Sequence, residues 1–554
     1  MSLFTKRIKF KKDDNKQDQE QSNQPEDTPT NPGMAARQKK QDQYDRPKYN
    51  RSMGIQQQKS DYYLKYKVSG LVEEDIENIK RIVGESYDFS SNTFNLENKE
   101  QKIKVGILFF AGLVDQTFVS ERISELLIKN FKNSNVILKS SKETLDYFKN
   151  NLLTMAGVTT SETYDKLINL LLNGDTILLV ENVKSCFIIS SRKMIERGVE
   201  QPTTNVTVKG SKVAFNENLL TNISLIRRII RHPSLWAKNY VIGDMSNTNV
   251  TLMYIKGVAS ETLIDEVTSR IEAIKANNVL GTTHIRYYLK EKQVSIFPIL
   301  YESERPDEVA GGLFEGRIAI LIDGSPYVII APNVLLHSIH SVEDFYQKAY
   351  IASFFRILRI IAFFISIFLP GLYLAVVLHH AEILPFSLLI SIAAQRGQVP
   401  FPVVVEIFIM TLAFDLLREA GARMPTALGG TLSFVGAIII GSVAVEAGLI
   451  SSIIIIIVTT SAIGSLAIPD YDLNLTITVS RYFFLILSAL LGFLGIGVGI
   501  TIYFGHLISL RSFGVPYLSP IVPFNKEGLK DSLIRLPLKN IQEDSRNINE
   551  KYPE

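Results

Sequence analysis

The amino-acid sequence predicts an α/β cytoplasmic domain of two lobes, followed by an all-α domain that crosses a membrane several times. Short apolar runs alternate with helical patterns between residues 63 and 350, as is typical of an α/β domain. Between residues 355 and 510 the chain instead contains uncharged stretches long enough to span the hydrocarbon core of a bilayer. The mean hydropathy of the whole chain is +0.12, so we expect part of it to lie in lipid.

Composition divides the chain into five segments. The first is rich in Lys, Asp, Gln, Asn and Pro and poor in β-branched and aromatic residues. Such a segment cannot bury enough apolar surface to offset its chain entropy, so it is predicted to be disordered. The predicted segments are a disordered tail (1–62), a first α/β lobe (63–200), a second α/β lobe (201–350), a polytopic membrane domain (355–510) and a cytoplasmic C-terminal tail (511–554).

Strands and helices within the two lobes follow from the spacing of apolar residues. Apolar runs between turn residues predict buried strands, and a 3.6-residue period predicts helices. The Asp323–Pro326 turn predicts a hairpin with the VIIAP run that follows it. The expected strands are Val105–Phe110, Thr176–Val180, Val250–Ile255 and Gly316–Ile322, and the expected helices are Glu121–Phe131, Glu162–Leu172 and Ser260–Ala276.

Charge, cysteine content and motifs argue against several classes of function. The net charge of +3 gives no support for a nucleic-acid partner, which would require a concentrated basic surface. Cys186 is the single cysteine, which excludes an intramolecular disulfide and a thiolate metal cluster. The sequence has neither an HExxH motif nor a GxxxxGK[ST] phosphate loop, so we expect no enzyme and no cofactor. The N-terminus does not resemble a signal peptide, which predicts cytoplasmic lobes.

Residues 355–510 are predicted to cross the membrane an even number of times. The span Ile360–Leu378 is nineteen residues without a charge, and the preceding Arg356 and Arg359 place its start in the cytoplasm. The C-terminal tail is also rich in Lys and Arg, so both ends should lie inside. The preferred prediction is four crossings, near 360–378, 399–417, 447–469 and 482–508. Two further apolar segments, Ile383–Ala394 and Met424–Val445, are then partial segments. The alternative is six crossings. With four crossings, Arg481 would lie outside, against the usual preference.

Ionisable side chains at hydrocarbon depth are costly and are therefore candidates for function. Two prolines near Glu406 interrupt helical hydrogen bonding beside a carboxylate, as the ion pathways of transporters do. The other interpretation is that these carboxylates pair with Arg418, Arg423 or Arg481 and only hold helices together, and it is favoured for Asp415. The candidate ion-path or gating residues are Glu406, Glu446, Pro400, Pro402, Asp415, Arg418 and Glu419.

Several short motifs follow one another in order along the chain, namely Ser303–Asp307 (SERPD), Leu321–Pro326 (LIDGSP), Glu343–Tyr346, Pro370–Tyr373, Val399–Pro402 (VPFP) with Glu406, Leu417–Pro425 (LREAGARMP) and Ser512–Pro516 (SFGVP). With these motifs, residues 65–525 resemble the A subunits of GerA-type spore germination receptors. The chain departs from the family pattern at Asp415, where the pattern has a glutamate, so the charge is retained with a shorter reach.

The resemblance implies a nutrient germinant receptor subunit in the spore inner membrane. Such a subunit is expected to assemble with a transporter-like B subunit, a lipoprotein C subunit and further copies of itself. It would convert germinant binding into the release of monovalent cations, as an oligomeric ligand-gated ion channel. The alternative is a secondary transporter of a small solute, although the membrane helices contain no convincing internal repeat.

Overall fold

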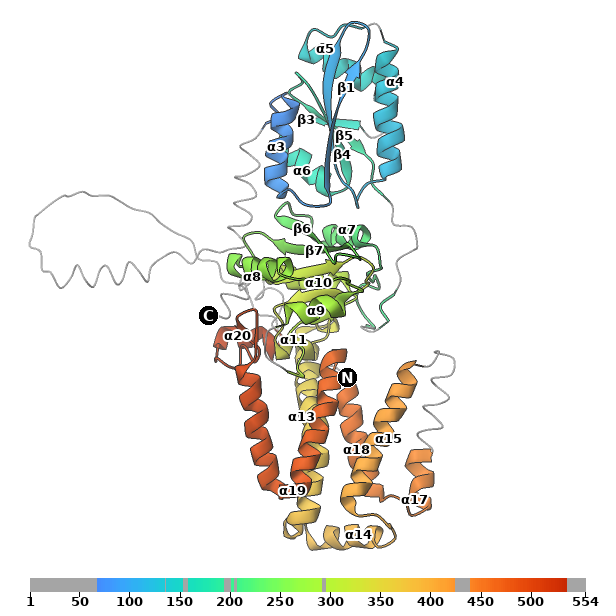
Figure 1. Cartoon of the computed structure of the whole chain (residues 1–554), viewed down its shortest axis with the longest axis vertical. Helices are drawn as coiled ribbons and strands as arrows, with labels where there is room; N and C mark the ends of the chain where they lie inside the picture. Colours follow the sequence, from blue (N-terminus) through green and yellow to red (C-terminus); the bar gives the residue numbers. More distant parts are fainter. Residues whose placement is uncertain are drawn as a thin grey trace, which may run out of the picture. The chain divides into compact units, whose positions relative to one another are not determined.

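The computed structural model describes residues 67–134, 136–152, 158–193, 201–203, 207–290, 295–423 and 439–535 (Figure 1). Three predicted features therefore lie outside the described residues, wholly or in part. They are the N-terminal tail at 1–62, the end of the C-terminal tail at 536–554, and residues 424–438 of the partial segment predicted at Met424–Val445.

The first lobe is a five-stranded antiparallel sheet with helices on both faces. Strand β4 is entirely buried, and its side chains alternate between the faces: Ile177 and Leu179 pack toward α3 and α6, while Leu178 and Val180 pack toward η1 and α4. The strand order is β1 (Phe89–Glu97), β2 (Lys102–Phe110), β4 (Asp175–Val180), β5 (Cys186–Ser190) and β3 (Val158–Ser161). The helices are α3 (Val72–Val83), η1 (Phe118–Glu125), α4 (Leu126–Lys132), α5 (Ser141–Tyr147), η2 (Phe148–Leu152) and α6 (Tyr164–Leu172).

The second lobe contains another five-stranded antiparallel sheet. Its central strands β7 and β9 supply a core on each face, one packed against α8 and α9 and the other against α7 and α10. The strand order is β6 (Leu235–Ile242), β7 (Thr248–Ile255), β9 (Ile318–Ile322), β10 (Val328–Ala331) and β8 (Tyr301–Ser303). The helices are α7 (Leu219–Ile229), α8 (Glu261–Glu272), α9 (Thr282–Leu289), α10 (Pro306–Phe314), α11 (Leu335–Ile339) and α12 (Glu343–Tyr346).

The two lobes share one topology. When the strands of each lobe are numbered from 1 to 5 along the chain, both sheets have the spatial order 1-2-4-5-3. Adding 142 to the residue numbers of the first lobe aligns α6 (164–172) with α10 (306–314). The same offset aligns Gly174 with Gly316, whose φ angles are 91° and 89°. The same shift pairs identical residues in the β3–α6 and β8–α10 turns, namely Ser161 with Ser303, Glu162 with Glu304, and Asp165 with Asp307. The soluble domain is therefore a duplicated fold.

The predicted fold class, an α/β domain followed by a helical domain, is confirmed. Each of the four expected strands lies within an observed strand or overlaps one, and the Asp323–Pro326 turn joins β9 to β10 as an antiparallel hairpin. The helices expected at Glu162–Leu172 and Ser260–Ala276 form as α6 and α8. The single helix predicted at Glu121–Phe131 is wrong in detail, because its first part belongs to the π-helix η1 and only its second part to α4.

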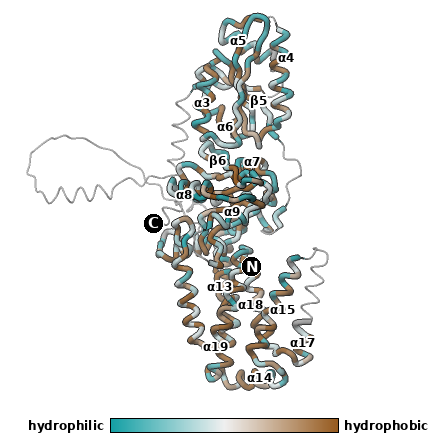
Figure 2. The backbone as a smooth tube through the Cα atoms, in the orientation of Figure 1, coloured by the Kyte–Doolittle hydropathy of each residue, from teal (hydrophilic) through white to brown (hydrophobic). Residues whose placement is uncertain are grey.

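The helical domain begins at residue 349. Helices α13 and α19 are the two among the described residues that are long and apolar enough to cross a membrane, and hydrophobic residues dominate the domain (Figure 2). The short α14 lies across the ends of its neighbours (Figure 1). The helices are α13 (Ala349–His379), η3 (Ala381–Ile383), α14 (Phe386–Arg396), α15 (Val403–Arg423), η4 (Ile439–Val443), α17 (Ala444–Glu446), α18 (Ser452–Leu466) and α19 (Tyr471–Ser509), followed by the β11–β12 hairpin (Arg511–Ser512, Val515–Pro516) and α20 (Lys526–Ser532).

Helix α19 is a hairpin of two legs that meet at Gly492. The backbone there has φ 60° and ψ −136°, a conformation open essentially to glycine alone. A straight helix of 39 residues would be about 58 Å long. Yet Asp472 near its start and His506 near its end both contact the second lobe, through Arg286 and Ser295 respectively. The chain can reach the lobe at both points because it reverses at Gly492.

This reversal corrects two predictions. The single crossing predicted near 482–508 is wrong, because the break at Gly492 divides that stretch between two legs. The placement of Arg481 on the outer side of the membrane, which followed from four crossings, is also wrong, because Arg481 occupies the middle of the first leg and is buried at 1% exposure. Apolar periodicity did not reveal the reversal because apolar residues dominate both legs and glycines also occur within unbroken helices.

Candidate functional site

The first site residue, Glu406, lies in the first turn of α15. Pro400 and Pro402 precede this helix and are exposed, and the Pro402 carbonyl accepts the Glu406 N–H at 3.0 Å. The predicted proline-broken helix is therefore wrong: the prolines lie before the helix begins, where a missing N–H has no helical partner to lose. Their effect is to set the start of α15 and thereby the position of Glu406.

The Glu406 carboxylate points at the beginning of α18. It is 1% exposed, and its Oε1 accepts a hydrogen bond from the backbone N–H of Ser451, the residue that caps α18. A carboxylate at a helix N-terminus is stabilised by the free N–H groups and the helix dipole. Glu406 thus joins α15 to α18, and no arginine in the described part of the bundle pairs with it.

Three buried oxygens from this part of the bundle lack hydrogen bonds. Glu406 Oε2, Ser451 Oγ and the Tyr373 hydroxyl have no hydrogen-bond partner among the residues that the structure describes. They come from α15, the start of α18 and α13, and Tyr373 packs against the apolar cluster that contains Val403, Ile407 and Ile454. Carboxylate and hydroxyl oxygens are the ligands that hard cations prefer. The cluster, here called the Glu406 site, offers oxygens without hydrogen bonds to described residues, in a bundle whose side chains are mostly apolar.

A second cluster lies around Asp415 and joins α13, α15 and α19. The Tyr482 hydroxyl donates to Asp415 Oδ2 at 2.8 Å, and Arg418 Nη2 and Arg481 Nη1 lie 3.6 and 3.7 Å from Oδ1. Arg481 also donates from Nε to the Ser366 carbonyl at 3.1 Å. One carboxylate thus faces two guanidinium groups, so the cluster carries an excess positive charge. For Asp415, the arrangement matches the interpretation of ion pairs that hold helices together.

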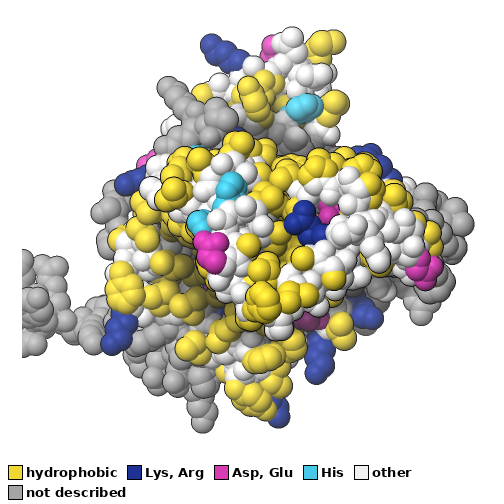
Figure 3. Space-filling model, turned by 90° about the horizontal axis from the view of Figure 1, so that it is seen from below, with side chains coloured by type: hydrophobic (Ala, Val, Ile, Leu, Met, Phe, Trp, Pro, Cys, Tyr) yellow, Lys and Arg dark blue, Asp and Glu magenta, His cyan; other side chains and the backbone are white. Residues whose placement is uncertain are grey.

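The remaining candidates do not join either cluster. Glu446 is exposed at the end of α17, and no ion pair to a described residue forms there. Glu419 is also exposed and pairs with Arg423 at 2.5 Å, one helical turn away. Both residues sit near helix ends, where water can solvate a carboxylate. Seen from the end of the helical domain, Figure 3 shows a largely hydrophobic surface around a hollow that contains basic and acidic side chains.

The start of α13 carries a buried ionic contact that the sequence did not predict. Arg356 Nε and Arg359 Nη2 lie 3.1 and 2.5 Å from the carboxylate of Asp344, which is 1% exposed. Burial opposes ionisation of Asp344, but hydrogen bonds and charge from the two arginines prevail and hold its pKa below the usual value. The arginines were interpreted only as markers of orientation, whereas they also fasten α13 to α12.

The second lobe also touches α19 through residues 295–300, here called the junction loop. The Thr476 hydroxyl on the first leg donates to the Ile296 carbonyl at 2.6 Å, and His506 on the second leg lies 2.9 Å from Ser295 Oγ. The Phe297 ring packs edge-on against Tyr503 with centroids 5.3 Å apart. A displacement of this loop would therefore act on both legs of the hairpin.

Sequence reasoning found the charged members of these clusters but missed their neutral partners. Tyr373, Ser451 and Thr476 stand in apolar or weakly polar runs, where hydroxyl residues are common and carry little signal. Asp344 was part of a family segment, but nothing in its spacing linked it to the arginines that follow.

The chain matches the family described as Bacillus/Clostridium GerA spore germination protein over residues 77–547. Spore germination protein KA of Bacillus subtilis (strain 168) is 38% identical over 85% of this chain and 85% of its own length. Spore germination protein A1 of the same organism is 36% identical over 80% of this chain and 90% of its own length. Spore germination protein GerLA of Bacillus cereus is 34% identical over 78% and 87% of the two chains.

The comparison with solved structures also finds similarity. The N-terminal domain of the A subunit of the Bacillus megaterium spore germinant receptor GerK3 matches with a TM-score of 0.39 and 29% identity over 49% of this chain and 98% of that one. The family match covers both lobes and the helical domain, and the relatives match over most of their length. This chain therefore belongs to the GerA family of spore germination proteins.

Proposed function

We propose that this chain is a non-enzymatic germinant receptor subunit of the spore inner membrane. In this proposal it converts nutrient binding into the release of monovalent cations, as an oligomeric ligand-gated channel. Its partners are further copies of itself, a transporter-like B subunit and a lipoprotein C subunit. Family membership supports the role in germination, because relatives that match most of the chain are themselves spore germination proteins.

The proposed topology has six crossings, with both lobes and the C-terminal tail in the cytoplasm. Support comes from the two ends of the helical domain, since α13 starts beside α12 and α19 ends beside the junction loop. Ends on the same side require an even number of crossings. The described segments along the bundle are α13, α15, α18 and the two legs of α19. The sixth crossing of the proposal is assigned to the apolar sequence Met424–Val445, most of which lies outside the described residues.

The observation that carries the channel proposal is the Glu406 site. A buried carboxylate oxygen without a hydrogen bond costs free energy, so its retention in an apolar bundle calls for a purpose. A conducting path needs oxygen ligands that hold a cation strongly enough to admit it and weakly enough to release it. Glu406 Oε2, with the two hydroxyls nearby, offers one such position.

Gating requires that germinant binding favour the open state over the closed state. In the proposed mechanism the second lobe transmits this preference at two places, the Asp344 contact with α13 and the junction loop on α19. The Asp415 cluster joins three helices and is the element whose ion pairs would rearrange.

Substitution of Glu406 by glutamine tests the proposal, because it keeps the shape and removes the charge. We expect germinant-triggered potassium release from spores to slow by about tenfold or more, equivalent to about 1.4 kcal/mol on the barrier. Protein level in the spore membrane should stay unchanged. The matched control is Glu446→Gln, an exposed carboxylate that should leave release unaffected.

Normal potassium release in the Glu406→Gln spores would remove this residue from the ion path. A parallel assay in liposomes, comparing uptake of labelled nutrient with release of potassium, separates a channel from a solute transporter. Uptake without potassium release would overturn the channel proposal.

A further inference from the structure

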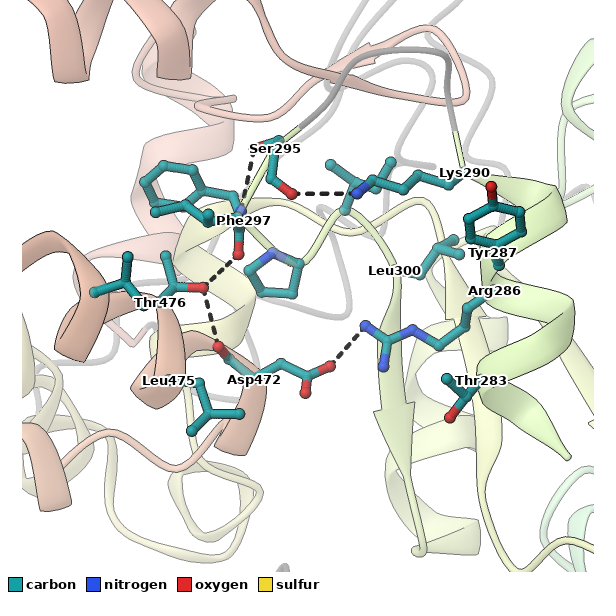
Figure 4. A pocket seen from close by; sticks show the side chains of 14 residues that line it. Thr283, Arg286, Tyr287, Lys290, Ser295, Phe297, Leu300, Asp472, Leu475 and Thr476 are labelled. Carbon is teal, nitrogen blue, oxygen red and sulfur yellow. Dashed lines mark hydrogen bonds and ion pairs between the residues drawn. The ribbon is translucent and has the colours of Figure 1, made fainter. Parts of the chain in front are cut away.

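A pocket of about 460 Å³ opens between the second lobe and the start of α19. Figure 4 shows its two walls: Arg286, Tyr287 and Lys290 on and just after α9, and Asp472 and Leu475 on α19. The junction loop forms the floor between them. The pocket thus adjoins the segment through which the lobe touches both legs of the hairpin.

The position of the pocket along α19 corresponds to a membrane surface. The first leg, from Tyr471 to the break at Gly492, is about 31 Å long, which equals the thickness of a typical hydrocarbon core. Asp472 then lies at the surface, and Leu475 and Val479 lie one and two turns deeper. These two apolar side chains are 41% and 53% exposed and share one face of the helix. They form an apolar track that leads from the pocket into the bilayer.

Among the described residues that line the pocket, one cation has no carboxylate partner. Arg286 is neutralised by Asp472 at 2.6 Å and by Glu302 at 3.3 Å. Lys290 Nζ donates to the Ser295 carbonyl at 3.2 Å (Figure 4), and no carboxylate in the described part of the chain pairs with it. Tyr287 beside it is 76% exposed, and tyrosine is enriched where proteins meet the headgroup region.

We propose that this pocket binds an anionic phospholipid of the surrounding bilayer. The phosphate group lies at Lys290 and an acyl chain covers Leu475 and Val479. A cation at the membrane surface next to an apolar track selects a molecule that carries an anion and a hydrocarbon chain together. Because the pocket is bounded by α9, the junction loop and α19, the bound lipid stabilises the contact of the second lobe with the hairpin. This site is separate from the Glu406 site and goes beyond the proposed channel.

The test uses the full chain purified in a neutral detergent and titrated with phosphatidylglycerol or phosphatidylcholine, with bound lipid counted by native mass spectrometry. Wild-type protein should retain phosphatidylglycerol in preference to phosphatidylcholine. Lys290→Gln should weaken phosphatidylglycerol binding about fivefold, the effect of one lysine charge near an anionic surface. Lys275→Gln, an exposed lysine of the same lobe, is the matched control and should bind as wild type.

A second variant examines the acyl-chain contact independently. Val479→Asn places a polar group on the track and should reduce retention of both lipids, while the thermal midpoint without lipid reports whether the variant is folded. Glycerol phosphate, which has no acyl chain, should not compete. Equal binding by wild type and Lys290→Gln overturns the proposal. Effective competition by glycerol phosphate also overturns it, because the pocket would then be a site for free phosphate compounds.

Discussion

The first and second lobes fold alike, but in the described part of the chain the first lobe contacts the second lobe, whereas the second also contacts the helical domain. The turn between β3 and α6 in the first lobe exposes Glu162 and Thr163 to solvent. The equivalent turn between β8 and α10 in the second lobe buries Glu304 and Arg305, at 5% and 1% exposure. The two turns therefore share the Ser-Glu-x-x-Asp pattern, but one is exposed and the other is buried. Their burial depends on the residues that pack against them.

Arg305 is the centre of this difference. Its guanidinium donates to Thr207 Oγ1 at 2.6 Å, to the Ser211 carbonyl at 2.9 Å and to both oxygens of Asp307. The Tyr346 hydroxyl of α12 donates to the same Asp307 at 2.7 Å. The turn thereby fastens the connector between the lobes to the helix that leads into α13. In the first lobe, Thr163 holds the position of Arg305, and its described contacts include a backbone bridge to Lys67 and hydrogen bonds with Ser161.

The largest difference between the lobes should appear when these two equivalent residues are replaced by alanine. Arg305→Ala leaves the half-buried Asp307 without its ion pair and releases the connector, so we expect a loss of about 3 kcal/mol in the free energy of unfolding. Thr163→Ala removes an exposed hydroxyl and should cost within about 0.5 kcal/mol. Denaturant unfolding of the purified full chain in detergent measures both. Equal losses would show that burial of the turn does not distinguish the lobes.

The duplication itself was not predicted, although the sequence contains its trace. Strands β4 and β9 were expected because each is a continuous apolar run of the right length, and helix α6 because of its period. The shift of 142 residues between the lobes preserves few identities beyond a Ser-Glu pair, an Asp and Gly174, since buried positions tolerate exchange among apolar residues of similar volume. Only the equal spacing of these polar and glycine positions could have revealed it.

Charges in the helical domain were easier to predict than geometry. Glu406 and Asp415 were found because a carboxylate in lipid is costly and therefore conspicuous. The reversal at Gly492 could not be located, because Gly495, Gly497 and Gly499 follow it within helical backbone and only tertiary contacts decide which glycine breaks the helix. The placement of Tyr373 and Ser451 in the Glu406 site depends on the same tertiary contacts, so the sequence alone does not predict it.

A second contrast between the lobes concerns pH. Burial raises the pKa of Glu308 to about 7, while hydrogen bonds from Ser303 and Tyr301 oppose the shift. The equivalent residue of the first lobe is Lys166, which is exposed. Because the folded protein holds a proton on Glu308 that the unfolded chain releases near pH 4.5, this contribution to stability is complete below pH 4.5 and is lost as pH rises through 7. The total is on the order of 3 kcal/mol.

Unfolding of the full chain between pH 5 and pH 8 checks this expectation. The wild type should lose stability as pH rises, and Glu308→Gln should flatten that part of the profile because the amide does not titrate. Lys166→Gln is the control in the other lobe and should keep the wild-type slope. A slope unchanged by Glu308→Gln would show that another group is responsible.

The smallest expected effect tests the equivalence of the lobes at a single turn. Gly324 after β9 has φ 78°, and Asn182 after β4 has φ 65°, so both occupy left-handed backbone at corresponding positions. Nothing lies within 4 Å of a Cβ added at Gly324. Asparagine tolerates this conformation, so Gly324→Asn should change stability by less than about 0.5 kcal/mol, whereas the β-branched Gly324→Val should cost about 1–2 kcal/mol. If asparagine proves as costly as valine in thermal unfolding, then the two turns are not equivalent, and the duplicated topology does not extend to the backbone demands of this position.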